Sequence, residues 1–426
     1  MGLAILLGVF GVSIVIGIPV AFAMGLAAAA TFAFEGFPTL LTFQRIVSGV
    51  SVFSLLAIPF FIFAGELMLH GGLALRLVRF ASALVGRVRG GLATVNIFSS
   101  MLFGGISGSA IADISALGSL IIPAMKEKGY RGDYAVNVTV TSSIAGVVIP
   151  PSHNMIIFAV AAGGGISISE LFLAGVIPGI LMCILLAVAA YVLAVKANYP
   201  AEPFPGVAFV LTAAAAALPG LFTAVIIVGG VLSGVFTVTE SGAFGAIYAF
   251  VLTALVYRSL SWKAFVECLV SAVRTTSVVM ILIGCASAFA YLLAFYQVPR
   301  LMTDTLLGIS DNPIVILIML NVILLALGMI MDMAALILIC TPIFLPIATS
   351  IGMDPVQFGI MMLVNLGLGL CTPPVGTCLF VGCAVGKVPI EQALRTIWPF
   401  YLAMLAALIL VTFVPSVSMF LPSLLE

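Results

Sequence analysis

Charged side chains are scarce in this sequence: Asp, Glu, Lys and Arg together make up 7% of its 426 residues. Hydrophobic residues supply 63% and the mean hydropathy is +1.37, which excludes a soluble globular domain. The 15 basic residues balance the 15 acidic ones, so the chain lacks the positive field that nucleic-acid binding requires. We therefore expect a chain whose solvent is the lipid bilayer, with no nucleic acid among its partners.

Signatures of metal binding and catalysis are also missing. The chain has two histidines, and its seven cysteines lie in apolar segments without a Cys-x-x-Cys pair, so we interpret them as small apolar fillers. The absence of an HExxH motif and of a nucleophile elbow disfavours an intramembrane enzyme, and we expect no organic cofactor. The N-terminus has no basic region followed by a cleavage site, so we expect the segment from Met1 to belong to the mature chain.

What the sequence does contain is an internal repeat. The following residues recur 223 positions later: Pro123 and Pro346, Gly129 and Gly352, Gly146 and Gly369, Pro150-Pro151 and Pro373-Pro374, and Gly163 and Gly386. The offset is 221 for Glu170 and Glu391 and for Pro178 and Pro399. Two halves of one design are typical of inverted-repeat transporters. A Pro-Pro pair cannot continue a helix, so we expect each half to carry a helix that is broken at membrane depth.

The apolar runs predict an all-α polytopic membrane protein, because about 20 helical residues span the hydrocarbon core. The first repeat, 1–196, is expected to hold two short spans in 3–34, an amphipathic arm at 37–55, a span at 57–80, a re-entrant hairpin at 92–124, a broken span at 134–162 and a span at 170–195. Residues 197–217 are expected to form a cytoplasmic linker and an amphipathic helix. The second repeat, 218–426, is expected to hold two short spans in 226–257, an arm at 259–271, a span at 272–296, a hairpin at about 312–346, a broken span at 355–386 and a span at 398–420.

The charges around the two hairpins predict opposite orientations. Basic residues flank 92–124 on both sides, at Arg76, Arg79, Arg87, Arg89, Lys126, Lys128 and Arg131. Both ends of this hairpin should therefore be cytoplasmic. The flanks of the second hairpin are acidic, at Asp304, Asp311 and Asp354, so it should enter from the other face. An odd number of crossings in each half gives the same inversion, with both chain ends on the external side.

Irregular backbone at membrane depth is tolerated only where it lines a cavity or is buried in protein. Each half has two such places, a hairpin tip and a Pro-Pro break, and we expect them to meet near the midplane and to offer carbonyl and hydroxyl oxygens to Na⁺. The candidates for sodium site 1 are Ser107, Gly108, Ser109, Ser143, Gly146, Ile149, Pro151 and Ser152. The candidates for sodium site 2 are Gly328, Asp332, Gly369, Thr372, Pro374, Gly376 and Thr377. The alternative is that these small residues only allow helices to pack closely.

The solute site is expected next to these breaks. The half-helices that begin after Pro151 and Pro374 present positive ends and free N–H groups, which suit a carboxylate. His153 and Asn154 depart from the repeat and are candidate solute-binding residues. Asp113, an intramembrane carboxylate, is a third candidate, and Glu240 is a further intramembrane carboxylate; each could instead have a structural role.

Four motifs in order make the chain resemble, over essentially its whole length, the large membrane subunit of TRAP (tripartite ATP-independent periplasmic) transporters. They are Gly104-Gly-Ile-Ser-Gly-Ser109, Ile149-Pro-Pro-Ser152, Phe236-Thr-Val-Thr-Glu-Ser241 and Thr372-Pro-Pro-Val-Gly-Thr377. Val238 departs from the commonest pattern, in which a proline is frequent at this position.

The resemblance implies a sodium-coupled elevator-type importer of the bacterial inner membrane. It also implies two partners, a small four-span membrane subunit and a soluble periplasmic binding protein that delivers a carboxylate solute. The segment with His153 and Asn154 is more similar to sialic-acid members. A stand-alone sodium/dicarboxylate carrier remains the alternative, and a channel is disfavoured because hairpins from both faces suit alternating access.

Overall fold

The computed structural model describes residues 1–424, and these residues form helices and connecting turns without a β-strand. Six helices are long and apolar enough to cross a membrane, or up to eight if two bent pairs are counted as spans. Six shorter apolar helices accompany them. The expected class, an all-α polytopic membrane protein with broken helices, is confirmed.

The first half contains fourteen consecutive elements. They are α1 (Gly2–Val15), α2 (Val20–Phe34), α3 (Thr39–Val50), the 3₁₀ turn η1 (Phe53–Leu56), α4 (Ala57–His70), α5 (Leu73–Val85), α6 (Gly91–Ser107), α7 (Ala110–Asp113), the π-helix η2 (Ile114–Gly118), α8 (Ser119–Glu127), α9 (Gly132–Ser142), α10 (Ala145–Val148), α11 (His153–Ala161) and α12 (Ile168–Lys196).

The second half repeats this order. Its elements are α13 (Val207–Leu232), α14 (Val238–Val251), the π-helix η3 (Leu252–Val256), α15 (Trp262–Phe295), α16 (Val298–Ile309), α17 (Pro313–Gly328), α18 (Met333–Ser350), α19 (Pro355–Leu370), α20 (Thr377–Gly386), α21 (Ile390–Thr396), α22 (Trp398–Phe413), α23 (Ser416–Met419) and the 3₁₀ turn η4 (Pro422–Leu424). By position, α5 matches α16, α6 matches α17, α9 with α10 matches α19, and α11 matches α20.

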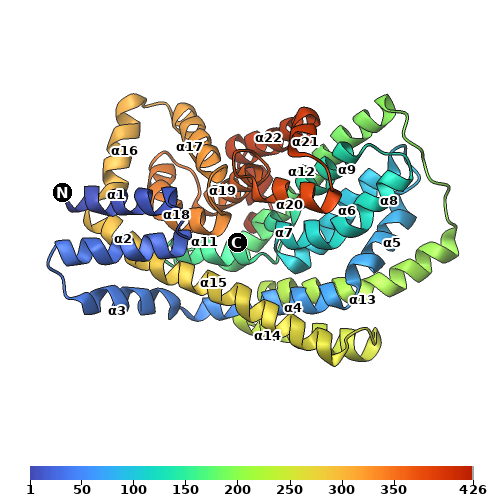
Figure 1. Cartoon of the computed structure of the whole chain (residues 1–426), viewed down its shortest axis with the longest axis horizontal. Coiled ribbons are helices and arrows are strands. Elements are labelled where there is room, and N and C mark those ends of the chain that lie inside the picture. Colours follow the sequence, from blue (N-terminus) through green and yellow to red (C-terminus); the bar gives the residue numbers. More distant parts are fainter. Residues whose placement is uncertain (425–426) are drawn as a thin grey trace.

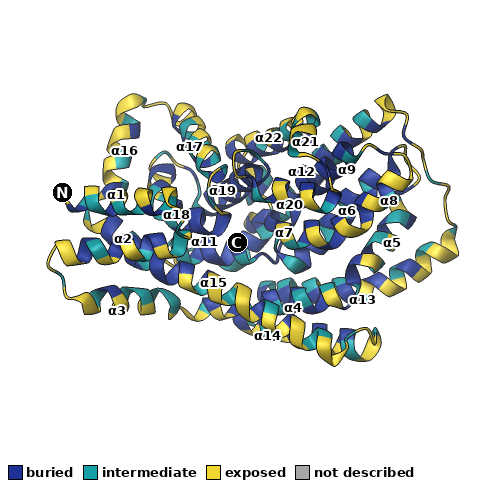
Figure 2. Cartoon of the chain, in the orientation of Figure 1, coloured by how far each residue is buried: buried dark blue, intermediate teal, exposed yellow. Residues whose placement is uncertain are grey.

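Six helices form a layer along one side of the hairpins and broken helices. We call α2, α3, α4, α13, α14 and α15 the arm layer, because α15 packs on α2, α3 and α4, and α14 packs on α4 and α13. Figure 1 shows α3, α4, α13, α14 and α15 along the lower edge of the molecule, below the hairpins and broken helices. In Figure 2 the helices at the centre are mostly buried, whereas α3 and α14 expose much of their surface. Exposed Leu40, Phe43 and Val47 on α3 have the apolar character of a lipid-facing surface.

The positions of the breaks follow from glycine and proline chemistry. Helix α6 ends at Ser107, and Gly108 follows with a φ of 60°, a left-handed conformation that glycine adopts at no steric cost. The break before α18 ends at Asp332, which caps the N-terminus of this helix. Its Oδ2 accepts a hydrogen bond from the Ala334 amide. Both Pro-Pro pairs, Pro150-Pro151 and Pro373-Pro374, interrupt their helices and have cis peptide bonds. The segment Gly132–Val148 meets α11 at an angle of 53°.

Two boundaries in the arm layer differ from those expected. The arm at 259–271 and the span at 272–296 form one helix, α15, of 34 residues. The span expected at 57–80 is divided into α4 and α5 at Gly71-Gly72, because Gly72 takes a left-handed conformation with a φ of 73°. The Arg76 Nη1 atom donates hydrogen bonds to the Gly71 and Gly72 carbonyls and so fixes this break.

The segment between the halves also differs from the expectation. Residues 207–217, expected to form a separate amphipathic helix, are the first three turns of the apolar helix α13. The predicted interruption near 237–240 is present, since α13 ends at Leu232 and α14 begins at Val238. Glu240 has a structural part here: with Thr237 it forms a capping box at the start of α14. The last predicted span, 398–420, is shorter, because α22 ends at Phe413.

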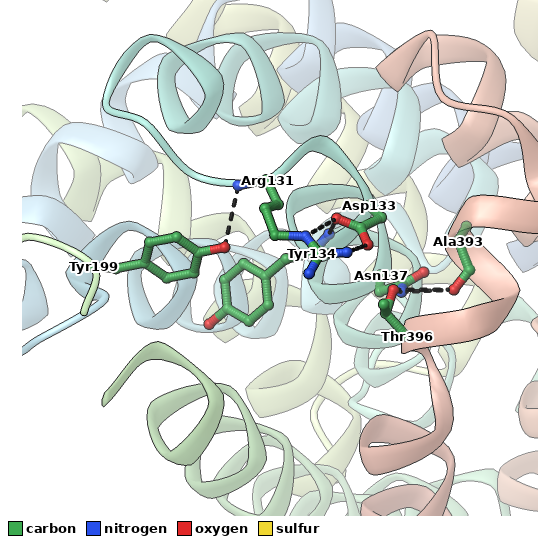
Figure 3. A network of polar contacts seen from close by, with 7 residues as sticks. All are labelled: Arg131, Asp133, Tyr134, Asn137, Tyr199, Ala393 and Thr396. Carbon is green, nitrogen blue, oxygen red and sulfur yellow. Dashed lines mark hydrogen bonds and ion pairs between the residues drawn. The ribbon is translucent and has the colours of Figure 1, made fainter. Parts of the chain in front are cut away.

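A polar network at the base of the first hairpin joins three parts of the chain (Figure 3). The Arg131 amide donates a hydrogen bond to the Tyr199 hydroxyl at 3.1 Å, which ties the linker to α9. Asn137 Nδ2 donates to the Ala393 carbonyl and to Thr396 Oγ1, both at 2.9 Å. The broken helix of the first half is therefore fastened to the linker and to α21 of the second half.

Candidate ion and solute site

In each half the hairpin tip lies against the broken helix, as the repeat predicted. A Cβ atom added at Gly146 would lie 2.7 Å from the Gly104 Cα, and one added at Gly369 would lie 2.7 Å from the Gly328 Cα. These approaches are closer than any side chain permits. Glycine is therefore required on the broken helix at both crossings, and the packing explanation for these small residues holds for Gly146 and Gly369.

The first tip and break also contact one another beyond the glycine crossing. A Cβ atom at Gly108 would lie 3.4 Å from the Pro151 carbonyl oxygen and 3.2 Å from the His153 Nδ1 atom. Ser109, next to Gly108, starts α7, and Ser152 is fully buried with a hydroxyl oxygen that has no hydrogen-bond partner. An orphaned buried oxygen beside a free carbonyl is the kind of ligand set that a hard cation takes.

The remaining candidates for site 1 lie on the broken helix. Ser143 donates its hydroxyl to the Val140 carbonyl at 2.8 Å and keeps lone pairs available as an acceptor. Ile149 is partly buried, and its side chain lies next to Gly105 of the first hairpin. Ser107, at the end of α6, is partly buried and close to Gly65 of α4.

The second tip and break are joined by a backbone hydrogen bond. The Val375 amide donates to the Met329 carbonyl at 3.0 Å, so the loop around Pro374 lies against the tip. Thr372 donates its hydroxyl to the Leu368 carbonyl at 2.8 Å, and Thr377 Oγ1 is buried without a hydrogen-bond partner. Gly376 is buried, with a φ of 37°.

Tyr401 of α22 supports the second break, a contact that the sequence analysis missed. Its hydroxyl donates to the Cys371 carbonyl at 2.6 Å, which satisfies a backbone acceptor that the Pro-Pro pair leaves free. The relevant signal in the sequence is weak, because a tyrosine in an apolar run gives no indication of its partner.

The two halves meet at one cavity of about 120 Å³, here called the inner cavity. Its polar lining comes from both tips and both breaks: Ser109, His153, Asn154, Asp332 and Thr377. The apolar lining includes Val147 of α10, Val279 of α15 and Leu370 of α19. The structure thus brings together residues that the sequence analysis assigned to site 1, to site 2 and to the solute.

A larger cavity of about 470 Å³, the outer cavity, lies between the arm layer and the first tip. It shares Ser109, Ile111 and His153 with the inner cavity. The arm layer contributes Ile62, Gly65, Glu66 and Leu69 from α4 and Ser271 and Thr275 from α15. The first hairpin contributes Phe103, Ser107, Ala112 and Ser115. Sequence reasoning did not find Ser271 and Thr275, because hydroxyl groups in a long apolar helix carry no positional signal.

Glu66 in the outer cavity is held by neighbours. Its Oε1 accepts a hydrogen bond from Ser271 at 2.7 Å, and its Oε2 lies 3.6 Å from His70 Nδ1, one turn away on α4. This geometry fits a structural pairing of Glu66 with His70, which lie four residues apart on one helix. The pair also joins α4 to α15 within the arm layer.

Neither cavity has a lysine or arginine among its lining residues. Favourable potential for an anion must therefore come from backbone dipoles and hydroxyl donors. Helix α11 begins at His153, in the wall shared by both cavities, and its first turn has no side-chain cap. Its uncapped N–H groups provide the positive helix end that a carboxylate needs.

Asp113, the third candidate solute-binding residue, lies behind the first tip. Its side chain is 1% exposed and is not among the residues that line either cavity. Asp113 is four residues after Ser109, so it lies one helical turn from the tip, where α7 packs on α6 and the Ser100 hydroxyl is a neighbour.

Comparison with known families identifies the architecture. Residues 7–417 match the family model described as the tripartite ATP-independent periplasmic transporter, DctM component. The chain belongs to this family. Membership agrees with the motifs from which the resemblance to the TRAP large membrane subunit was drawn, and it establishes a multi-pass membrane transporter and not an enzyme.

Individual relatives cover nearly the full chain. The chain is 40% identical over 423 residues to an uncharacterized protein, YgiK, of Salmonella typhimurium, covering 99% of this chain and 97% of that protein. It is 40% identical to the sialic acid TRAP transporter large permease protein SiaM of Vibrio cholerae, over 89% of each chain. It is 35% identical to the C4-dicarboxylate TRAP transporter large permease protein DctM of Rhodobacter capsulatus, over 100% of both chains.

A solved structure with the same fold is the YdaH transporter of Alcanivorax borkumensis. The TM-score is 0.64 at 15% sequence identity, with 87% of each chain covered. At this identity the likeness describes the fold alone. It supports the overall arrangement of the helices in this chain.

Proposed function

We propose that this chain is the large membrane subunit of a sodium-driven importer in the bacterial inner membrane, and that it takes up a carboxylate solute delivered by a periplasmic binding protein. The observation that carries the proposal is the inner cavity, where both tips and both breaks contribute oxygen-bearing side chains around one small volume. Such adjacency allows an importer to couple an ion to a solute, because one ligand can then change the binding free energy of the other directly.

Sodium is the coupling ion that fits the available ligands. The candidate ligands are carbonyl and hydroxyl oxygens with one carboxylate, Asp332, and the cavity lining contains no cysteine. Hard oxygen donors suit an alkali or alkaline-earth cation. Site 1 would be built from the oxygens of Ser107, Ser109, Ser143 and Ser152 with the backbone of Gly108, Gly146, Ile149 and Pro151. Site 2 would be built from Asp332, Thr372 and Thr377 with the backbone of Gly328, Gly369, Pro374 and Gly376.

Ion binding at both sites would draw each tip onto its break and complete the seat for the solute carboxylate at the start of α11. His153 and Asn154 would then orient the carboxylate, since they border the inner cavity beside the free N–H groups. The hairpins and broken helices would move against the arm layer once loaded. The outer cavity supports this division, because it lies between α4 and α15 on one side and the first tip on the other.

The solute that we favour is sialic acid. The outer cavity, about 470 Å³, lies within the range of roughly 300–1,000 Å³ that encloses drug-sized ligands. Its lining includes the hydroxyl groups of Ser107, Ser109, Ser115, Ser271 and Thr275, which can pair with the hydroxyl groups of a sugar acid. The relative from Vibrio cholerae is named for sialic acid, whereas the relative from Rhodobacter capsulatus is named for C4-dicarboxylates.

Two partners complete the proposed transporter. One is a small four-span membrane subunit, and a relative from Oleidesulfovibrio alaskensis named DctMQ, of which this chain covers 66%, is long enough to include a further subunit. The other is the binding protein that presents the solute at the external face.

The test is uptake of labelled sialic acid into proteoliposomes that contain this chain with its small subunit. We expect uptake only when an inward sodium gradient and the binding protein are both present. Uptake of a C4-dicarboxylate and not of sialic acid would refute the proposed solute and leave the proposed transport mechanism unchanged. Uptake by this chain alone would establish a stand-alone carrier and refute the tripartite assembly.

A further inference from the structure

A group of buried polar side chains lies behind the first tip, outside both cavities. Its members are Asn96, Ser99 and Ser100 on α6, Asp113 on α7, and Thr139 and Ser142 on α9; we call them the α6–α9 cluster. Each is at most 1% exposed. Six polar residues enclosed among three helices at membrane depth are costly unless they satisfy one another or a ligand.

The cluster satisfies itself only in part. Asn96 Nδ2 donates to Thr139 Oγ1 at 2.6 Å, and the Ser100 and Ser142 hydroxyls lie 3.1 Å apart. The Asn96 Oδ1 atom, the Ser99 Oγ atom and both carboxylate oxygens of Asp113 have no hydrogen-bond partner. The Ser100 hydroxyl is the polar group that faces the Asp113 carboxyl group. The unsatisfied atoms are therefore all oxygen atoms able to accept, and two of them belong to the one acidic side chain of the cluster.

The repeat provides an internal comparison. At the offset of 223, the position of Asp113 corresponds to Leu336, and the position of Ser142 corresponds to Asn365. Asn365 Nδ2 donates to the backbone carbonyl and to the side-chain Oδ1 of Asn321, both at 2.9 Å, so neutral groups join the equivalent helix crossing, and Asn365 Oδ1 is left without a partner. The fold thus packs this crossing without a carboxylate. Asp113 is an addition to the first half that packing does not require.

The backbone beside Asp113 departs from the repeat as well. The π-helix η2 begins directly after Asp113, whereas the matching helix α18 is α-helical from Met333 to Ser350. π-helical segments are rare and frequently occur at functional sites. The added carboxylate and the altered backbone coincide in the sequence.

We propose that the α6–α9 cluster binds a third sodium ion, with the Asp113 carboxylate as its anionic ligand and the Ser100 hydroxyl as a neutral one. The inference rests on the proposed sodium coupling and adds one ion to it. A bound cation would neutralise a charge for which residues 1–424 provide no ion pair. The ligand chemistry is that of sodium, because the unsatisfied atoms are hard oxygens with one negative charge.

The position of this site gives it a part in coupling. The Asp113 amide donates to the Ser109 carbonyl at 3.0 Å, and Ser109 lines both cavities. A cation held between α6, α7 and α9 would therefore fix the tip one helical turn away without touching the solute. It would raise the affinity of the inner cavity for its ligands by restricting the open states of the tip.

The experiment counts sodium ions. The full-length chain, co-purified with its small subunit, is titrated with ²²Na⁺ at equilibrium, and the bound ²²Na⁺ per chain is measured at saturation. We expect Asp113→Asn to bind one ion fewer than the wild type, and Asp113→Leu, which installs the residue of the second half, to do the same. Ser100→Ala should keep the number and weaken the affinity by about tenfold, since a neutral ligand is lost. Ser119→Ala on the exposed side of α8 is the matched control and should bind as the wild type does.

Equal ²²Na⁺ binding by the wild type and by folded Asp113→Asn would overturn the proposal. That result is the one expected if Asp113 carries a proton or contacts a water molecule and binds no sodium ion. Ser100→Ala keeps the test decisive if Asp113→Asn does not fold, because wild-type affinity in that variant would also overturn it. Failure of the proposed function is distinguishable, since then the wild type itself would bind no ²²Na⁺.

Discussion

The crossing of Gly104 and Gly146 allows the clearest test of the tip-and-break arrangement. In Gly146→Ala the new Cβ atom would lie 2.7 Å from the Gly104 Cα, whereas ordinary van der Waals contact begins at 3.4 Å. The obstructing atom belongs to the backbone, so no side-chain rotation relieves the clash and α6 must move away from α10. Overpacking of this kind costs about 1–3 kcal/mol. This free energy destabilises the conformation in which the hairpin tip and the helix break are in contact, here called the closed state.

A penalty of about 1–3 kcal/mol on the closed state lowers the apparent sodium affinity by about 5- to 150-fold. The assay is the sodium concentration at half-maximal uptake in proteoliposomes. Gly229→Ala on α13 is the control, because its Cβ atom would meet nothing within 4 Å and alanine favours a helix by about 0.5–1 kcal/mol over glycine. A Gly146→Ala variant with the half-maximal sodium concentration of the wild type would refute the reasoning.

Three further predictions concern other parts of the chain. Asp332→Asn removes the charge from the inner cavity and should abolish or strongly weaken the sodium dependence of uptake; unchanged dependence would exclude site 2 as proposed. Asn137→Ala leaves the Ala393 carbonyl and Thr396 without their buried donor and should lower the free energy of unfolding by about 1–3 kcal/mol, measured by denaturant titration against exposed Thr212→Ala. Thr237→Val removes the capping box of α14 and should destabilise the protein by about 1 kcal/mol; an unchanged midpoint of unfolding would contradict this.

The breaks in the fold could be predicted from sequence because proline and glycine act locally. Pro19 precedes α2, and the division of 3–34 into two helices follows from it. The lengths of the arm helices could not be predicted in the same way, because apolar composition continues across their boundaries. A usable signal did exist for α15: from Trp262 to Ile283 the sequence contains no glycine or proline, so nothing interrupts the helix.

The positions of the candidate residues at helix breaks could be predicted from the sequence, but their meeting in one cavity could not. Spacing placed Ser109, His153, Asp332 and Thr377 at breaks in the helices, yet their meeting in one cavity depends on how the two halves pack. The burial of Asp113 likewise depends on the packing of α7 against α6. Tertiary contacts of this kind leave no trace in the periodicity of one chain.

The two halves share a backbone design but not a chemistry, and this difference bears on how a transporter with pseudo-symmetry can be selective. Similar halves give the hairpins equivalent contacts with their broken helices, as the paired glycine crossings show. The polar groups are unequal: the first half supplies His153, Asn154 and the buried Asp113, and the second supplies Asp332. Symmetric packing allows two conformations of similar free energy. In the proposed mechanism, the unequal polar groups would determine which ligands must be bound before the protein passes from one conformation to the other.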